Sequence, residues 1–136
     1  MIHVVAGALF NSIGRVLLAQ RPEGKHMAGG GEFPGGKLEP GEERFAGLQR
    51  ELREELGIQA QAGEPLICYE HRYADRLVTL DLWLVTKYSG EPQSLEGQPL
   101  KWVTLDDLDA AGLLEADKPM IPALRGLEAW AMGCRM

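Results

Sequence analysis

The stretch that most constrains the fold of this chain is GKLEPGEERFAGLQRELREELGI, residues 36–58. No proline or β-branched residue interrupts it between Glu43 and Leu56, and Gly57 follows as a residue suited to the left-handed conformation at a helix end. Four apolar residues recur at steps of three and four, which places them on one face of a helix. They are Phe45, Leu48, Leu52 and Leu56. The pattern predicts an amphipathic helix over residues 43–56.

Glu51, Glu54 and Glu55 share another face of this predicted helix. Like charges at this spacing destabilise a helix by about 0.2–0.5 kcal/mol per pair, so we expect a cation beside them. Oxygen ligands without His or Cys suit a hard divalent cation, Mg²⁺ or Mn²⁺. Arg50 can reach Glu54 or lie against Glu51, and so hold a carboxylate in one orientation. The alternative interpretation is a solvated charged face with ordinary Glu–Arg pairs.

Glycine and proline punctuate the loop before the predicted helix. Residues 33–37 read Phe-Pro-Gly-Gly-Lys and residues 39–41 read Glu-Pro-Gly. Backbone of this kind can approach a ligand closely and offer carbonyl oxygens to a bound ion. This context favours the metal hypothesis over a solvated charged face.

Together these residues resemble the signature of the Nudix hydrolase family. The matching positions are Gly36, Glu42, Arg50-Glu51-Leu52, Glu54-Glu55 and Gly57-Ile58. The likeness continues toward the MutT branch of the family in residues 26–37, 75–80, 96–99 and 116–119. The resemblance implies an α/β or α+β fold, specifically the Nudix α/β/α sandwich with a mixed central β-sheet. It also implies a nucleotide hydrolase that depends on Mg²⁺, with Mn²⁺ as the alternative ion.

The resemblance also assigns roles to individual residues. The implied metal ligands are the Gly35 carbonyl, Glu51, Glu54, Glu55 and Glu96. The implied catalytic residues are Glu51 and Glu96, either of which can accept the proton of the attacking water, and Arg50. The implied substrate-binding residues are Arg21, His26 and Lys37 at the phosphates or sugar, Phe33 and Arg76 beside the base, and Asp117. For these side chains the ordinary alternatives are a solvated loop residue or, for Phe33, a place in the core.

Asp117 stands where the best-known MutT pattern has Asn. Oxidation of guanine at C8 turns N7 into an N–H donor, which an amide or a protonated carboxyl can distinguish from ordinary guanine. An ionised Asp117 can accept from that N–H, or instead from the amino group of cytosine, as in CTP-hydrolysing relatives. A helix N-cap before Lys118-Pro119 is the structural alternative.

The rest of the chain reads as strands and short helices. We expect an opening hairpin, a chain break at Gly63–Pro65 and a central strand with two buried faces at Leu77–Val85. The hairpin strands are His3–Phe10 and Arg15–Gln20, further strands are Leu66–Tyr73 and Leu100–Thr104, and the later helices are Leu105–Ala111 and Pro119–Trp130.

Length and charge narrow the class of protein. The 136 residues fit a single domain over residues 1–136, and a net charge of −6 counts against binding a nucleic-acid polymer. No apolar run reaches about 18 residues, so we expect no membrane partner and a cytoplasmic location. Cys68 and Cys134 lack metal-type spacing and are expected to be thiols, with a disulfide as the alternative. We expect a monomer.

The function that the resemblance implies is hydrolysis of a nucleoside triphosphate to the monophosphate and pyrophosphate. The favoured substrate is 8-oxo-dGTP, which would make the protein a sanitiser of the nucleotide pool in DNA replication and repair. The alternative is a CTP, dCTP or oxidised-pyrimidine triphosphate pyrophosphohydrolase. A non-catalytic nucleotide sensor is the hypothesis from a different class, and such a module is expected to lose the carboxylates that this chain keeps.

Overall fold

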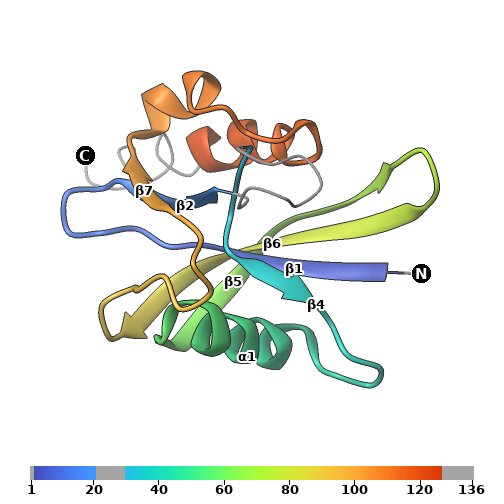
Figure 1. Ribbon diagram of the computed structural model, residues 1–136, viewed down its shortest axis with the longest axis horizontal. Coiled ribbons are helices and arrows are strands. Elements are labelled where there is room, and N and C mark those ends of the chain that lie inside the picture. Colours follow the sequence, from blue (N-terminus) through green and yellow to red (C-terminus); the bar gives the residue numbers. More distant parts are fainter. Residues whose placement is uncertain (1, 21–29, 127–136) are drawn as a thin grey trace.

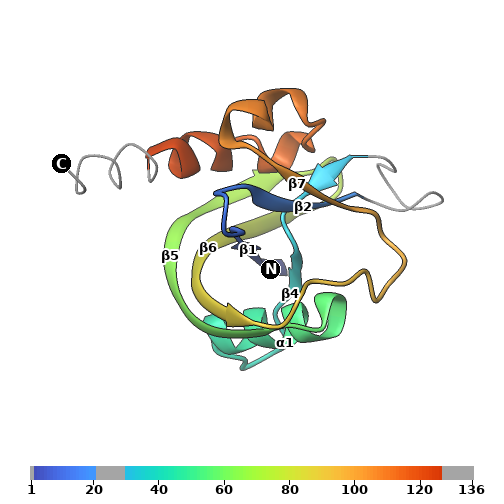
Figure 2. The ribbon, with the colours of Figure 1, turned by 90° about the vertical axis from the view of Figure 1, so that its left-hand side faces the viewer.

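The computed structural model describes residues 2–20 and 30–126. Two curved sheets lie between α1 on one side and short helical segments on the other, as Figures 1 and 2 show. The fold is mixed α+β, with the layers that the sequence predicted. The strands are β1 (Ile2–Ala8), β2 (Val16–Gln20), β3 (Gly31–Glu32), β4 (Gly35–Lys37), β5 (Gln59–Arg72), β6 (Leu77–Ser89) and β7 (Leu100–Val103). The helices are α1 (Arg44–Leu56) and the 3₁₀ helices η1 (Leu105–Ala110) and η2 (Glu115–Asp117), and residues 120–126 are also helical.

The predicted helix is confirmed, beginning one residue later than its first predicted residue. Glu43 is the N-cap, and its carboxylate accepts hydrogen bonds from the backbone N–H groups of Phe45 and Ala46. Gly57 ends the helix in the left-handed conformation, with φ of 72°. The apolar stripe faces inward, and Leu48, Leu52 and Leu56 are fully buried.

The larger sheet has the strand order β4-β1-β6-β5. β1 runs parallel to β6, whereas its pairing with β4 and the pairing of β5 with β6 are antiparallel, so the sheet is mixed as predicted. β6 lies inside this sheet, and its side chains reach both layers of the core. Val78, Leu80 and Leu82 join the cluster on the side of the short helices, whereas Trp83 and Val85 join the cluster under α1.

The prediction of an opening hairpin is wrong beyond the turn. The β1 and β2 segments meet only at the turn, where Leu17 N–H donates to the Leu9 carbonyl at 3.0 Å and Phe10 forms a bridge with Val16. β1 then pairs with β4 and β6, whereas β2 pairs with β3 and β7 in a separate three-stranded sheet. The strands part because different partners, distant in sequence, take their backbone hydrogen bonds.

The break predicted at Gly63–Pro65 is also wrong. β5 runs through it, with bulges between Ala60 and Ile67. Pro65 is tolerated because β5 is an edge strand, where a residue without an N–H need not break a ladder. Gly63 is needed because a Cβ there would collide with the Phe45 ring. Glycine and proline here mark a bent strand that packs closely on α1.

The first of the two later predicted helices is tighter than expected, and the second begins one residue later than predicted. Residues 105–110 form a 3₁₀ helix, with the Thr104 hydroxyl accepting from Asp107 N–H at 3.2 Å. The final helix is seen from residue 120, after Pro119, and the rest of its predicted span lies outside the described residues. No helix in the described ranges is long and apolar enough to cross a membrane. Cys68 is an exposed free thiol, and Cys134 lies outside the described residues.

Candidate active site

Glu51 lies directly against the backbone of β4. A Cβ atom at Gly36 would collide with the Glu51 carboxylate, so a larger residue there would displace the Glu51 side chain. Gly35 is restricted more strictly, because a Cβ there would collide with backbone, at the Val5 carbonyl of β1. The two glycines therefore have a physical task, which is to bring bare backbone beside the acidic face of α1.

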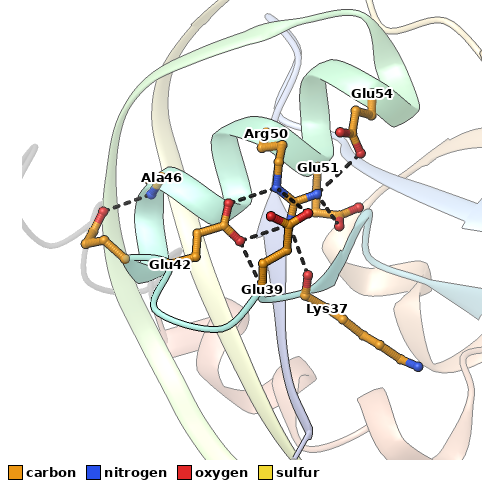
Figure 3. A network of polar contacts seen from close by, with 8 residues as sticks. Lys37, Glu39, Glu42, Ala46, Arg50, Glu51 and Glu54 are labelled. Carbon is orange, nitrogen blue, oxygen red and sulfur yellow. Dashed lines mark hydrogen bonds and ion pairs between the residues drawn. The ribbon is translucent and has the colours of Figure 1, made fainter.

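Arg50 holds several carboxylates in place, as Figure 3 shows. Its guanidinium donates to both oxygens of Glu42 at 2.8 and 2.9 Å, to Glu51 at 2.9 Å and to Glu54 at 3.3 Å. It also donates to the Lys37 carbonyl at 3.1 Å. The hydrogen bond from Arg50 holds the pKa of Glu42 at about 2. Both predicted orientations of Arg50, toward Glu54 and toward Glu51, occur together.

Glu55 faces the same region but has no cationic partner among the described residues. Its Oε2 accepts from Gly35 N–H at 3.2 Å, and its Oε1 lies 3.4 Å from the amide nitrogen of Gln98. Burial raises the pKa of Glu55 to about 7, and the charges of Glu96, Glu32 and Glu51 add to the increase. The Gly35 hydrogen bond acts in the opposite direction and does not compensate.

The pKa of Glu51 is also raised, chiefly by burial, even though Arg50 donates to it. The negative charges of Glu54 and Glu96 contribute to this increase. The loop carrying Glu96 therefore lies close enough to α1 for its charge to act on both helix glutamates. One arginine does not neutralise this group of carboxylates.

The donor set fits a hard divalent cation better than any other occupant. It consists of carboxylate oxygens and nearby backbone, without sulfur or imidazole among the described residues of this face. The carboxylates are not gathered into a single coordination sphere. Within the described ranges, three metal-type donor atoms lie within 4.8 Å of one another only at His3, Cys68 and Asp81. Mutual repulsion of the glutamates gives a physical reason for this spacing.

Next to the carboxylates is a cleft lined by four predicted substrate-binding residues. Phe33 and Lys37 come from the segment before α1, Arg76 from the turn between β5 and β6, and Asp117 from η2. Lys37 connects the cleft to the carboxylates, because its carbonyl binds Arg50 while its side chain lines the cleft and extends away from Arg50 in Figure 3. Arg21 and His26, the other two predicted contacts, lie outside the described residues.

Asp117 is 8% exposed, and its Oδ2 accepts from Phe33 N–H at 3.2 Å. Phe33 is 4% exposed and packs in the core, and it also lines the cleft. The Tyr69 hydroxyl donates to the Ala116 carbonyl at 2.6 Å, which fixes the η2 segment against β5. Asp117 is therefore a buried carboxylate with an acceptor oxygen at a fixed place in the cleft wall.

Sequence reasoning missed three residues of this region. Glu32 and Tyr73 also line the cleft, and Gln98 is a buried amide beside Glu55. Glu32 immediately precedes Phe33, so its position beside a predicted base contact was an available signal. Gln98 lies in the 96–99 stretch of the family resemblance, but that resemblance assigned it no role, and only tertiary packing brings Tyr73 and Gln98 to this site.

Comparisons with known proteins agree with this geometry. The NUDIX domain family model matches residues 5–123. The chain is 41% identical to the "CTP pyrophosphohydrolase" of Escherichia coli (strain K12), covering 95% of each protein. It is 37% identical to the "8-oxo-dGTP diphosphatase" of the same strain, covering 93% of this chain and 98% of that protein.

The fold of this chain also matches a solved structure along most of its length. The solution structure of the E. coli ORF135 protein aligns with a TM-score of 0.84 at 40% identity, covering 95% of this chain and 91% of that one. The match therefore extends over both sheets, α1 and the short helices that form the cleft wall.

Proposed function

The chain belongs to the Nudix family, and from this premise we propose that it hydrolyses nucleoside triphosphates to the monophosphate and pyrophosphate with Mg²⁺ as its ion. The observation that carries this proposal is the excess of negative charge on α1 beside the cleft. Burial raises the pKa values of Glu51 and Glu55, the neighbouring glutamate charges add to the increase, and among the described residues Arg50 is the one positive group in the causes. A divalent ion bound with a triphosphate would supply further positive charge.

Each residue has a distinct task in this proposal. Glu51, Glu54, Glu55, Glu96 and the Gly35 carbonyl would hold the ion, which neutralises phosphate charge and activates water. Glu51 or Glu96 accepts the proton of the attacking water. Arg50 orients Glu51 and Glu54 and is thus a positioning residue. Lys37 lines the cleft and is proposed to contact the phosphates, with Arg21 and His26 proposed from the sequence alone.

For the base we propose 8-oxoguanine. A carboxylate at Asp117 can accept from the N7–H that oxidation creates, and ordinary guanine lacks that donor. Phe33 and Arg76 border the same cleft. The protein would then remove 8-oxo-dGTP from the nucleotide pool before replication incorporates it.

A second candidate is CTP or dCTP, and one contact favours it. Asp117 already accepts a hydrogen bond from Phe33 N–H, which suits an ionised carboxylate that also accepts from the cytosine amino group. The similarity to a protein named CTP pyrophosphohydrolase supports this candidate about as much as the similarity to the 8-oxo-dGTP diphosphatase supports the first.

The test is a panel of 8-oxo-dGTP, dGTP, CTP and dCTP, assayed for released pyrophosphate with wild type, Asp117→Asn and Asp117→Ala. We expect 8-oxo-dGTP to have the highest kcat/KM and Asp117→Asn to keep that preference, because an amide oxygen also accepts from N7–H. If cytosine is the base, Asp117→Asn lowers kcat/KM for CTP and dCTP tenfold to a hundredfold, about 1–3 kcal/mol. Unchanged ratios in both variants would mean that Asp117 does not read the base.

Mg²⁺ and Mn²⁺ are separated by titrating each into the same assay, and we expect activity with Mg²⁺ at millimolar concentration. We also propose a monomer that works in the cytoplasm, where its substrate pool lies. Light scattering on purified protein at several concentrations tests the monomer, and fractionation of cells tests the location.

A further inference from the structure

We propose that Gln98 is a positioning residue that holds the Glu96 loop and the Glu55 carboxylate in one fixed arrangement. This inference rests on the proposed function, because it assigns Gln98 a task in building the ion site. It starts from the loop between β6 and β7, which contains Glu96 and which ends at a buried polar side chain.

The loop is attached to the C-terminal end of α1 through backbone hydrogen bonds. Gln93 N–H donates to the Leu56 carbonyl at 3.0 Å, and Leu95 N–H donates to the Glu55 carbonyl at 3.2 Å. These carbonyls belong to the last turn of the helix, where no intrahelical N–H is available to them. These bonds fix the position of the loop relative to the end of α1. They do not restrain the Glu55 side chain.

Gln98 supplies the missing side-chain connection. It is 6% exposed, and its Oε1 accepts from Glu96 N–H at 3.2 Å. The Ser94 hydroxyl donates to the Gln98 backbone carbonyl and also lies 3.1 Å from the same Oε1. Because Oε1 faces Glu96 N–H, the amide nitrogen points the other way, where it lies 3.4 Å from Glu55 Oε1. One side chain thus contacts the backbone of one implied ligand and the carboxylate of another.

The chemistry of this position requires an amide. A carboxylate at residue 98 would place a further negative charge against Glu55, which already lies among Glu96, Glu32 and Glu51. An apolar side chain would leave Glu96 N–H without its acceptor and Glu55 Oε1 without its donor. Glu55 Oε2 is held separately by Gly35 N–H, so the Gln98 contact is what restrains the other oxygen.

The variants are Gln98→Met, which keeps the length without hydrogen bonds, and Gln98→Asn, which keeps the amide but shortens its reach. Gln93→Met is the matched control, because Gln93 lies in the same loop with an exposed side chain. Three quantities are measured for each: Mn²⁺ affinity of the nucleotide-free protein by electron paramagnetic resonance, hydrogen exchange of the Glu96 amide, and the Mg²⁺ concentration for half-maximal turnover.

We expect both Gln98 variants to weaken Mn²⁺ binding about tenfold and to raise the half-maximal Mg²⁺ concentration by a similar factor, which is the usual effect of removing a group that orients a metal ligand. The Glu96 amide should exchange faster, and turnover should approach the wild-type value at saturating Mg²⁺. The Gln93→Met control should match wild type. A purely structural role would instead lower turnover at every Mg²⁺ concentration, together with Tm.

Equal Mn²⁺ affinity and Glu96 exchange in wild type and both Gln98 variants would overturn the inference while leaving the proposed function intact. A wild type that binds Mn²⁺ but hydrolyses no triphosphate would overturn the proposed function, and the Mn²⁺ and exchange comparison would still decide the role of Gln98. A wild type that does not bind Mn²⁺ would overturn both.

Discussion

Two carboxylate regions lie at opposite ends of α1, and they differ in the charge of the groups that contact them. At the start of the helix, Asp81 of β6 is fully buried beside Arg44 and His3. Toward its end, Glu55 is partly buried beside other glutamates. Burial alone raises the pKa of both acids, so the difference between them comes from their partners.

Asp81 receives its positive charge from within the fold. Arg44 donates to both oxygens at 2.6 and 2.8 Å, and His3 Nε2 lies 2.8 Å from Oδ2. These bonds outweigh burial, so the pKa of Asp81 lies below its ordinary value. Arg44 also lies 5.0 Å from the centroid of the Trp83 ring, which packs the guanidinium against the sheet.

Glu55 receives only neutral N–H donors, and its pKa rises to about 7. Proximity of metal-type side chains is therefore a poor guide to an ion site in this protein. His3, Cys68 and Asp81 are the tighter group, but Arg44 already neutralises it. The glutamates of α1 are more spread out, and Arg50 contacts Glu51 and Glu54 but not Glu55, so a cation would relieve the remaining negative charge.

The largest effect is expected from Glu54→Gln, which tests whether the glutamates of α1 bind a cation. Glu54→Gln should lower Mg²⁺-dependent turnover about a hundredfold or more, because it removes an implied ligand, while Tm of the metal-free protein stays the same or rises as repulsion falls. Steady-state kinetics at limiting and saturating Mg²⁺ and a thermal melt measure this. The control is Glu70→Gln on exposed β5, and wild-type turnover of Glu54→Gln at limiting Mg²⁺ would show that Glu54 is no ligand.

Asp81→Asn tests the neutralised region and should act on stability instead. It weakens charged hydrogen bonds to Arg44 and His3, so we expect a loss of about 2–3 kcal/mol in the free energy of unfolding. Urea unfolding measures the loss, with Asp75→Asn in the exposed β5–β6 turn as control. The half-maximal Mg²⁺ concentration should change little. A large change there would mean that the two regions are coupled through α1.

The pH dependence of stability should have opposite signs in the two regions. Unfolded Glu55 loses its proton near pH 4.5, whereas the folded, metal-free protein keeps it to about pH 7. The folded state binds more protons in this window, so the contribution of Glu55 is present below it and is lost as pH rises through it, on the order of 3 kcal/mol. Asp81, with a lowered pKa, contributes stability that is lost as pH falls.

Unfolding in chelator from pH 3 to pH 8 separates these contributions. Relative to wild type, Glu55→Gln should remove the decrease between about pH 4.5 and 7, and Asp81→Asn should flatten the acid side. Parallel curves for wild type and Glu55→Gln would mean that Glu55 keeps an ordinary pKa. The charge deficit at the proposed ion site would then be smaller than the geometry indicates.

The smallest expected effect comes from Arg44→Lys. A lysine keeps the charge but loses the two-pronged contact with Asp81 and the planar packing on Trp83. We expect a loss of about 1 kcal/mol in unfolding free energy, read from the urea midpoint. No measurable loss would show that charge alone, without the guanidinium geometry, neutralises Asp81.

The sequence determined the helix and what it carries. The spacing of the α1 residues places Leu48, Leu52 and Leu56 inward and Glu51, Glu54 and Glu55 on another face, because helical periodicity depends only on neighbours along the chain. Arg50 likewise lies within one turn of its partners Glu51 and Glu54. The family signature was readable for the same reason, since it is contained in one continuous stretch.

Only the tertiary structure decided how distant segments meet that helix. The separation of β1 and β2 into two sheets, and the continuous path of β5 through Gly63 and Pro65, depend on partners far away in sequence. The same is true of Asp117 against Phe33 and of Gln98 against Glu55. A lone Asp or Gln in a loop is compatible with many contacts, and burial among specific neighbours selects one of them. The physical reason is that charge, donors and acceptors act through space, whereas a sequence pattern records only separation along the chain.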